Sequence, residues 1–136
     1  MATTAVEMKL ELIHIPVSDV DRARDFYVKQ CGWELITDHV QLGDMRIVQI
    51  VPPGSGCAIL MGRNIPEITD MPAGSQKGIH LVVPDVAAAR QQLAGNGVDM
   101  GGIQDLGGVL YSRFEDPDGN MWLLQQWEHG GTNDYS

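Results

Sequence analysis

The sequence predicts an α+β fold built from two βαβββ modules, and three observations lead to this prediction. A twelve-residue stretch, Ile13 to Arg24, returns 66 residues later as Ile79 to Arg90, with seven positions identical. Each copy begins with alternating apolar residues and continues at helical spacing. Each copy is also followed by three strand candidates separated by turn residues. A repeat of this period is a supersecondary unit, and neighbouring copies stack to bury a shared core.

The first module begins with an alternating segment, residues 8–17, which is rich in Leu, Ile and Val and is typical of a strand. Ser18 or Asp19 can cap the helix that follows, and Asp21 completes a capping-box pattern with Ser18. Gly32 is placed to end this helix. The remaining strand candidates of the module are Trp33–His39, Met45–Val51 and Cys57–Met61.

The second module repeats this order after a linker, residues 63–77, that contains little periodicity. A strand is expected at 78–84, and Asp85 caps a helix that runs through Leu93. The sequence Asp-Pro-Asp-Gly at 116–119 is a tight-turn signal between the last two strands. The strand candidates of this module lie at about 98–104, 109–115 and 120–127.

The length of 136 residues is enough for one domain with its own core. We expect a single domain over residues 8–128, followed by a loose polar tail at 129–136. Its parts are a first module at about 8–62, the linker at 63–77 and a second module at about 78–128.

The net charge of −9 and the pI near 4.6 argue against nucleic acid as a partner, because phosphate binding requires basic patches. Carboxylate-rich surfaces are also repelled by anionic lipid. No apolar stretch approaches the ~20 residues of a membrane span. The first residues lack the basic and then apolar order of a signal peptide. These features predict a soluble, cytoplasmic protein that interacts with neither nucleic acid nor membrane.

Two motifs carry a family resemblance. The first helix contains Asp-Val-x-x-Ala-Arg-x-Phe-Tyr from Asp19 to Tyr27, and Asp-Pro-Asp-Gly-Asn precedes the last strand at 116–120. Together with the paired βαβββ modules, these motifs resemble the vicinal oxygen chelate superfamily. This group includes glyoxalase I, bleomycin- and fosfomycin-resistance proteins, extradiol dioxygenases and methylmalonyl-CoA epimerase. The resemblance covers roughly residues 8–128.

The resemblance implies that the four strands of each module curl into a half-barrel. Two half-barrels, from one chain or from two exchanged chains, then enclose a cavity for a small-molecule ligand. It also favours a homodimer. In the metal-using members the ligands are His, Gln or Glu on the first and last strands of each module, donors that suit a divalent metal.

When the sequence is aligned with this family pattern, none of the metal-ligand positions carries a side chain that can bind a metal. The first position falls on Leu12, and its counterpart in the second module falls on Gly78. The usual carboxylate position falls on Leu123, and the fourth lies near Ile59 or Leu60. None of these side chains binds a metal, so the sequence predicts no metal and no other cofactor.

Polar side chains stand one step along the strands from these empty positions. Residues two apart in a strand share a face, so His14, His80 and Gln125 lie on the faces of Leu12, Gly78 and Leu123, respectively. Pairing the last two strands across the turn at 116–119 indicates that they share a face as well. The residues expected on it are Tyr111, Arg113, Leu123, Gln125 and Trp127.

We therefore expect a small, fairly apolar, oxygen-bearing molecule to bind in the cavity. The first hypothesis is metal-independent acid–base chemistry of the isomerase, lyase or cyclase type, with His14 and His80 as catalytic residues. The substrate-binding residues would be Gln125, Arg113, Tyr111, Trp127, Leu12 and Leu123.

Other interpretations stay open. The chain can be a binding protein of the bleomycin-resistance type that sequesters a drug or metabolite without chemistry. It can also be a divalent-metal enzyme of the glyoxalase or dioxygenase kind with displaced ligands. Both histidines can instead be core residues with satisfied hydrogen bonds, alike only because the module was duplicated.

Overall fold

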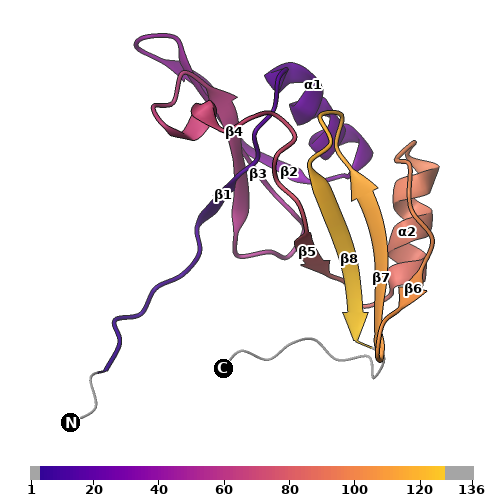
Figure 1. Cartoon of the computed structure of the whole chain (residues 1–136). Coiled ribbons are helices and arrows are strands. Elements are labelled where there is room, and N and C mark those ends of the chain that lie inside the picture. Colours follow the sequence, from indigo (N-terminus) through magenta and orange to yellow (C-terminus); the bar gives the residue numbers. More distant parts are fainter. Residues whose placement is uncertain (1–3, 128–136) are drawn as a thin grey trace.

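The computed structural model describes residues 4–127, whose strands form two four-stranded sheets (Figure 1). The first sheet has the order β1 (Leu12–His14), β4 (Ala58–Arg63), β3 (Met45–Val51) and β2 (Glu34–Gln41). The second has the order β5 (Ile79–Val82), β8 (Met121–Trp127), β7 (Val109–Glu115) and β6 (Gln104–Asp105). In both sheets the first strand of the module pairs in parallel with the last, and the other pairs are antiparallel.

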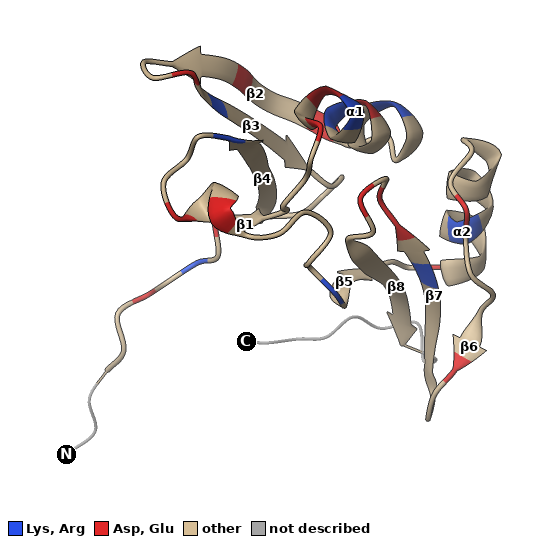
Figure 2. Ribbon diagram, turned by 45° about the horizontal axis from the view of Figure 1, so that its top comes forward, with Lys and Arg blue, Asp and Glu red and all other residues tan. Residues whose placement is uncertain are grey.

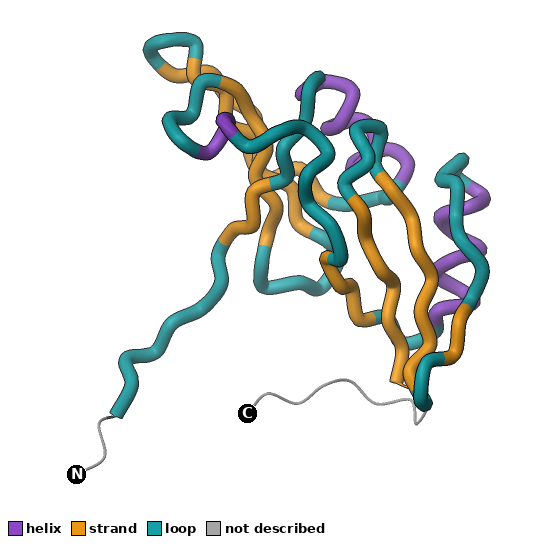
Figure 3. The backbone as a smooth tube through the Cα atoms, in the orientation of Figure 1, coloured by secondary structure: helices purple, strands orange, loops and turns teal. Residues whose placement is uncertain are grey.

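One helix belongs to each sheet, which confirms the α+β fold with two βαβββ modules. Helix α1 (Val20–Asp25) continues into a π-helical turn, η1 (Phe26–Gln30), and packs against β3 and β4. Helix α2 (Val86–Gly95) packs against β7 and β8. The linker between the modules is mostly loop, with one 3-10 turn, η2 (Ile68–Asp70), as Figure 3 shows. No helical segment between residues 4 and 127 combines the length and hydropathy that a membrane crossing requires.

The helix caps explain why the repeated aspartate occurs in both modules. The Asp19 carboxylate accepts a hydrogen bond from the Arg22 N–H at 3.1 Å, and the Asp85 carboxylate accepts one from the Ala88 N–H at 3.1 Å. Each bond satisfies a free N–H of a first helical turn. The predicted capping box between Ser18 and Asp21 is wrong, because Ser18 bonds to the second module instead.

Two predicted strands are shorter than expected. The segment at 8–17 pairs only over Leu12–His14, and residues 4–11 are assigned to no strand. The segment at 98–104 is reduced to the two residues of β6. In that segment Gly101 lies against the backbone of Arg113, and its carbonyl accepts hydrogen bonds from the side chains of Ser112 and Arg90. These side-chain hydrogen bonds stand where a regular strand pair would have backbone hydrogen bonds. The predicted tail at 129–136 lies outside the described residues.

One face of each sheet contributes to a single apolar core. Buried core residues from both modules include Val48, Ile50, Ile59 and Met61 on the first sheet and Phe114, Trp122 and Leu124 on the second. Phe26 and Tyr27 of η1 lie in the same cluster as Trp33 and Trp122, and the Tyr27 and Trp33 rings stack at 5.1 Å. The helix-bearing faces of both sheets thus point into one core, and their opposite faces point away from it.

A buried carboxylate joins the modules through the Asp-Pro-Asp-Gly-Asn turn. The Tyr27 hydroxyl donates to Asp116 Oδ2 at 2.8 Å and accepts from the Trp122 indole N–H at 2.9 Å. Asn120 donates its Nδ2 to the Pro16 carbonyl at 2.8 Å. The Ser18 N–H donates to Asp118 Oδ2 at 3.1 Å. The turn of the second module is thereby bonded to the β1–α1 connection of the first.

We predict that Tyr27→Phe destabilises the protein by about 1–3 kcal/mol. The substitution removes the hydroxyl that bonds to Asp116 and leaves the buried Trp122 N–H without its acceptor. Urea unfolding followed by fluorescence measures the change. Tyr111→Phe is the matched control, because the Tyr111 hydroxyl makes no hydrogen bond to any residue between 4 and 127. Equal stability of the two variants would contradict the role of this network.

Candidate functional site

The second sheet presents all of the predicted binding residues except Leu12 on one face. Arg113 pairs with Leu123, Tyr111 with Gln125, and Val109 with Trp127. On the other side of β8, His80 pairs with Leu123 and Val82 with Gln125. Directly paired residues share a face, so the strand register confirms the predicted grouping. This face is opposite to the one that packs on α2, and we call it the second open face.

The first sheet has a corresponding open face that contains Leu12 and His14. Leu12 pairs with Ala58 and His14 with Leu60, and Leu60 in turn pairs with Gln49. The register also separates the two residues, Ile59 and Leu60, that are candidates for the fourth position of the family pattern. Leu60 lies on this first open face, whereas Ile59 is on the core side, 3% exposed.

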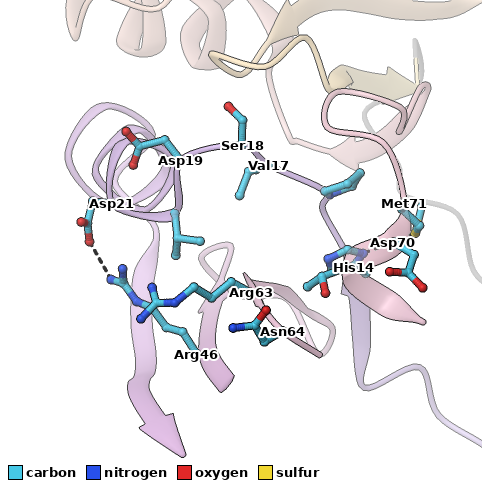
Figure 4. A pocket seen from close by; sticks show the side chains of 14 residues that line it. His14, Val17, Ser18, Asp19, Asp21, Arg46, Arg63, Asn64, Asp70 and Met71 are labelled. Atoms are coloured by element: carbon cyan, nitrogen blue, oxygen red, sulfur yellow. Dashed lines mark hydrogen bonds and ion pairs between the residues drawn. The ribbon is translucent and has the colours of Figure 1, made fainter. Parts of the chain in front are cut away.

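His14 lines a cleft of about 600 Å³ at the carboxyl ends of β1 and β4 (Figure 4). Its Nδ1 lies 3.3 Å from the Met71 sulfur, and its carbonyl accepts a hydrogen bond from Gln76. Partial burial lowers the pKa of His14 below 6.5, so the ring is neutral near physiological pH. The other walls come from three segments: Pro16 to Asp21, Gly62 to Asn64 with Arg46, and Thr69 to Met71.

The arginines of this cleft are already paired. Arg46 makes a bidentate bond to Asp38 at 3.0 and 2.9 Å and also contacts Asp21 at 2.7 Å. The guanidinium groups of Arg46 and Arg24 hold the pKa of Asp38 at about 2. Arg63 is bidentate to Asp44 at 3.1 and 2.8 Å. Figure 2 shows how these charges gather around α1, β2 and β3, while β8 carries none.

Sequence reasoning missed Arg46, Arg63, Asn64, Asp70 and Met71 as neighbours of His14. Arg46 lies on the core-facing side of β3, in line with Val48 and Ile50, where alternation predicts an apolar residue and not a charge that contacts Asp21 of α1. Met71 and Asp70 come from the linker, whose path no local periodicity describes. Asp70 lines the cleft, and no ion pair among residues 4–127 includes it.

His80 lies apart from His14, on the other sheet. Its side chain is exposed, its Nδ1 donates to the Gly78 carbonyl at 2.7 Å, and its ring stands edge-on to Tyr111 at 5.9 Å. Donation from Nδ1 leaves Nε2 as the acceptor. The cleft of His14 does not include His80 among its lining residues. The repeat places the two imidazoles at equivalent positions on the two sheets, and within one chain both positions lie on faces turned away from the common core.

The second open face combines aromatic area with hydrogen-bonding groups. Gln125 is 7% exposed, and Tyr111 and Trp127 are half-buried. The buried indole N–H of Trp127 has no acceptor among residues 4–127. Arg113 is paired with Glu115, so its charge is partly neutralised. Such a surface can stack on a flat ligand and donate a hydrogen bond to a ligand oxygen.

The residues at the family's metal positions do not fit a metal. Leu12, Leu60, Gly78 and Leu123 offer no donor atom. Between residues 4 and 127, no three side chains of the His, Cys, Asp or Glu type gather as a metal site would require.

Comparison with known proteins agrees with this architecture. The family profile of the glyoxalase/bleomycin resistance protein/dioxygenase superfamily matches residues 9–124. The chain belongs to this superfamily. A protein of Shewanella frigidimarina (strain NCIMB 400), described as uncharacterized, is 35% identical over 88% of this chain and 95% of its own length.

Solved structures of the superfamily share the fold. TnmS3, an antibiotic binding protein from Streptomyces sp. CB03234, is 31% identical with a TM-score of 0.80, over 91% of this chain and 99% of that one. A superfamily member from Sphaerobacter thermophilus DSM 20745 is 30% identical with a TM-score of 0.77, over 88% and 98% of the two chains.

We predict that the pKa of His14 measured by NMR lies below 6.5 and that this histidine makes stability depend on pH. A lowered pKa in the folded state means that the unfolded chain binds the proton more readily. The contribution is complete above pH 6.5 and is lost as the pH falls through the folded-state value. In the His14→Gln variant, the unfolding free energy should fall less steeply than in the wild type as the pH drops below 6.5. A titration midpoint at or above 6.5 would contradict the burial of the ring.

Proposed function

We propose that the protein binds a small, flat, fairly apolar molecule that carries oxygen groups, in the manner of an antibiotic-binding protein. The observation that carries this proposal is the second open face, where Trp127 and Tyr111 offer aromatic area and an indole N–H lacks an acceptor within residues 4–127. The similarity to TnmS3, whose description names antibiotic binding, supports the same class of ligand.

Each group of this face has a distinct part in binding. The rings of Trp127 and Tyr111 would stack on the ligand, and the Trp127 N–H would donate to one of its oxygens. Gln125 adds an amide between them in the register of β7 and β8. Leu123 and Val82 supply apolar contact on either side of His80. Arg113 would lie at the rim, where its pairing with Glu115 limits its pull on anions.

We further propose that the ligand cavity is completed in a homodimer. The two open faces of one chain lie on the sides of the sheets that are turned away from the common core, so neither covers the other. The first open face of one chain would close over the second open face of its partner. Leu12 and His14 would then form the wall opposite Tyr111, Gln125 and Trp127 of the partner subunit.

Metal-independent acid–base chemistry is a second candidate, because His14 and His80 lie on the two faces that would meet in the proposed dimer. A neutral imidazole can accept a proton, and the proposed dimer would bring His14 of one chain toward His80 of the partner subunit. The reaction would be of the isomerase, lyase or cyclase type. Sequestration of a ligand without chemistry needs only the cavity, whereas catalysis also needs correctly placed histidines.

The test of binding uses isothermal titration calorimetry with a panel of ligands. Tetracycline and quercetin represent flat oxygen-rich molecules, and bleomycin represents a larger cationic one. We expect binding of the flat class in the micromolar range or tighter, about −8 kcal/mol. Absence of heat with every member of the panel would count against the proposal.

We predict that Trp127→Phe weakens the affinity for the bound flat ligand about three- to tenfold, because one hydrogen bond is worth about 1 kcal/mol. The aromatic face is kept, so the change reports mainly on the indole N–H. Trp33→Phe is the matched control, since Trp33 lies in the core, 7% exposed. An unchanged affinity in Trp127→Phe, or an equal loss of affinity in the control, would show that the Trp127 N–H does not bind the ligand.

Catalysis and sequestration are separated with His14→Ala and His80→Ala. If the protein is an enzyme, liquid chromatography coupled to mass spectrometry resolves a product of the incubated ligand, including an isomer of equal mass, and either variant abolishes it while binding is largely kept. If it is a sequestering protein, the ligand is recovered unchanged from the wild type.

A further inference from the structure

The first open face carries a chain of hydrogen bonds that the proposed function does not use. On β2, the Thr37 hydroxyl oxygen lies 3.1 Å from His39 Nδ1, and the Gln41 amide nitrogen lies 3.0 Å from His39 Nε2. These residues occupy alternating positions of β2, so their side chains share one face of the sheet. The His39 ring is thus held by both of its nitrogens.

The direction of these hydrogen bonds follows from the atoms involved. An amide nitrogen only donates, so His39 Nε2 accepts from Gln41 and the ring proton is on Nδ1. His39 Nδ1 then donates to Thr37 Oγ1, and the hydroxyl can accept this bond and still donate its own proton. No hydrogen bond within residues 4–127 takes up that proton. Because each bond in such a chain polarises the next, the Thr37 hydroxyl is a strengthened donor.

Strand pairing places Thr37 in one row with His14. Thr37 pairs with Gln49, and Gln49 pairs with Leu60. Leu60 pairs in turn with His14. Because directly paired residues share a face, this row crosses the first open face from β2 to β1. The two outer strands are three strand spacings apart, about 14 Å along the sheet. The row therefore spans the wall that we propose for the ligand cavity.

The two ends of this row have opposite hydrogen-bonding character. At the β1 end, the Met71 sulfur has no proton to give, so His14 Nδ1 donates to it and His14 Nε2 is left as an acceptor. Figure 4 shows the His14 ring beside Met71. At the β2 end, the Thr37 hydroxyl is a donor. A ligand that lies along the row would meet an acceptor at one end and a donor at the other.

The rows of this face that contain Thr37 and His39 hold no charged side chain. Asp38 and Arg46 lie on the opposite side of β2 and β3 and bind each other there. The neighbour of Thr37 on this face is Gln49, which is half-buried. Burial of a carboxylate requires a paired charge, whereas burial of a carbonyl oxygen requires only a hydrogen bond. This end of the row therefore suits a neutral acceptor oxygen.

We propose that the Thr37 hydroxyl, oriented by His39, selects ligands that carry a neutral carbonyl oxygen at the end of the cavity beside β2. This inference rests on the ligand-binding function proposed above and gives β2 a part in its specificity. Thr37 is the residue that touches the ligand. His39 is a positioning residue, because it acts through the Thr37 hydroxyl. The carbonyl end of the ligand would lie over Thr37 and Gln49, and its rings would extend toward Leu60.

Two probes that differ in a single carbonyl group test this selection. Xanthone is a flat tricyclic molecule with one carbonyl, and xanthene has a methylene group in its place. Their affinities for the full chain are measured by quenching of tryptophan fluorescence. We expect the wild type to prefer xanthone about three- to tenfold, and Thr37→Val, which keeps the side-chain shape without the hydroxyl, to lose most of this preference.

Thr37→Ser is the matched control, because it keeps the hydroxyl and should retain the preference for xanthone. His39→Phe keeps an aromatic ring without a proton donor. It should lose part of the preference while its affinity for xanthene stays that of the wild type. A wild type that does not discriminate between the probes, or a Thr37→Val variant that still does, would overturn the inference.

NMR of the free protein tests the chain of hydrogen bonds without a ligand. With the ring neutral, the nitrogen chemical shifts of His39 should show the proton on Nδ1. Gln41→Leu removes the donor to Nε2 and should shift the tautomer balance away from that state. A proton on Nε2 in the wild type would overturn the orientation of Thr37 by His39.

The outcomes separate this inference from the proposed function. If quercetin or tetracycline binds in the calorimetry but Thr37→Val leaves the preference for xanthone unchanged, only the role of Thr37 is overturned. If the wild type binds none of the ligands, xanthone and xanthene included, the proposed function is overturned and the selection by Thr37 with it.

Discussion

The architecture depends on one buried carboxylate. Asp116 accepts from the Tyr27 hydroxyl at 2.8 Å, from the Asn120 side chain at 2.8 Å and from the backbone of its own turn, and it is 5% exposed. A buried charge is tolerated only when hydrogen bonds replace its water. Here the donors come from both modules, so satisfying this carboxylate requires the modules to dock. The tight turn and the first helix are thus parts of a single interaction.

This docking decides which surfaces are left for binding. Because Tyr27 and Trp33 of the first module pack against Trp122 of the second, the helix-bearing faces meet and are buried together. The opposite faces, with His14 on one and His80 on the other, are left outward. A site that needs both faces must therefore use another chain.

The sequence predicted correctly which residues share a strand face. It did not predict which distant segments of the chain lie close together. Alternation placed Tyr111, Arg113, Gln125 and Trp127 on one face, and the strand register agrees. The repeat predicted related positions for His14 and His80, and they lie at equivalent places on the two sheets. Met71, the residue in contact with His14 Nδ1, lies 57 positions away in a linker without periodicity. Contacts of that kind depend on the path of the whole chain.

By itself the sequence determined the paired modules and the aspartates Asp19 and Asp85 that cap their helices. These follow from local periodicity and from backbone groups that need caps, which act over a few positions. Only the tertiary structure decided that Ser18 binds Asp118 instead of capping its helix, and that paired arginines line the cleft of His14. The reason is that burial and charge pairing bring together groups distant in sequence, and their energies outweigh local preference once the two modules share one core.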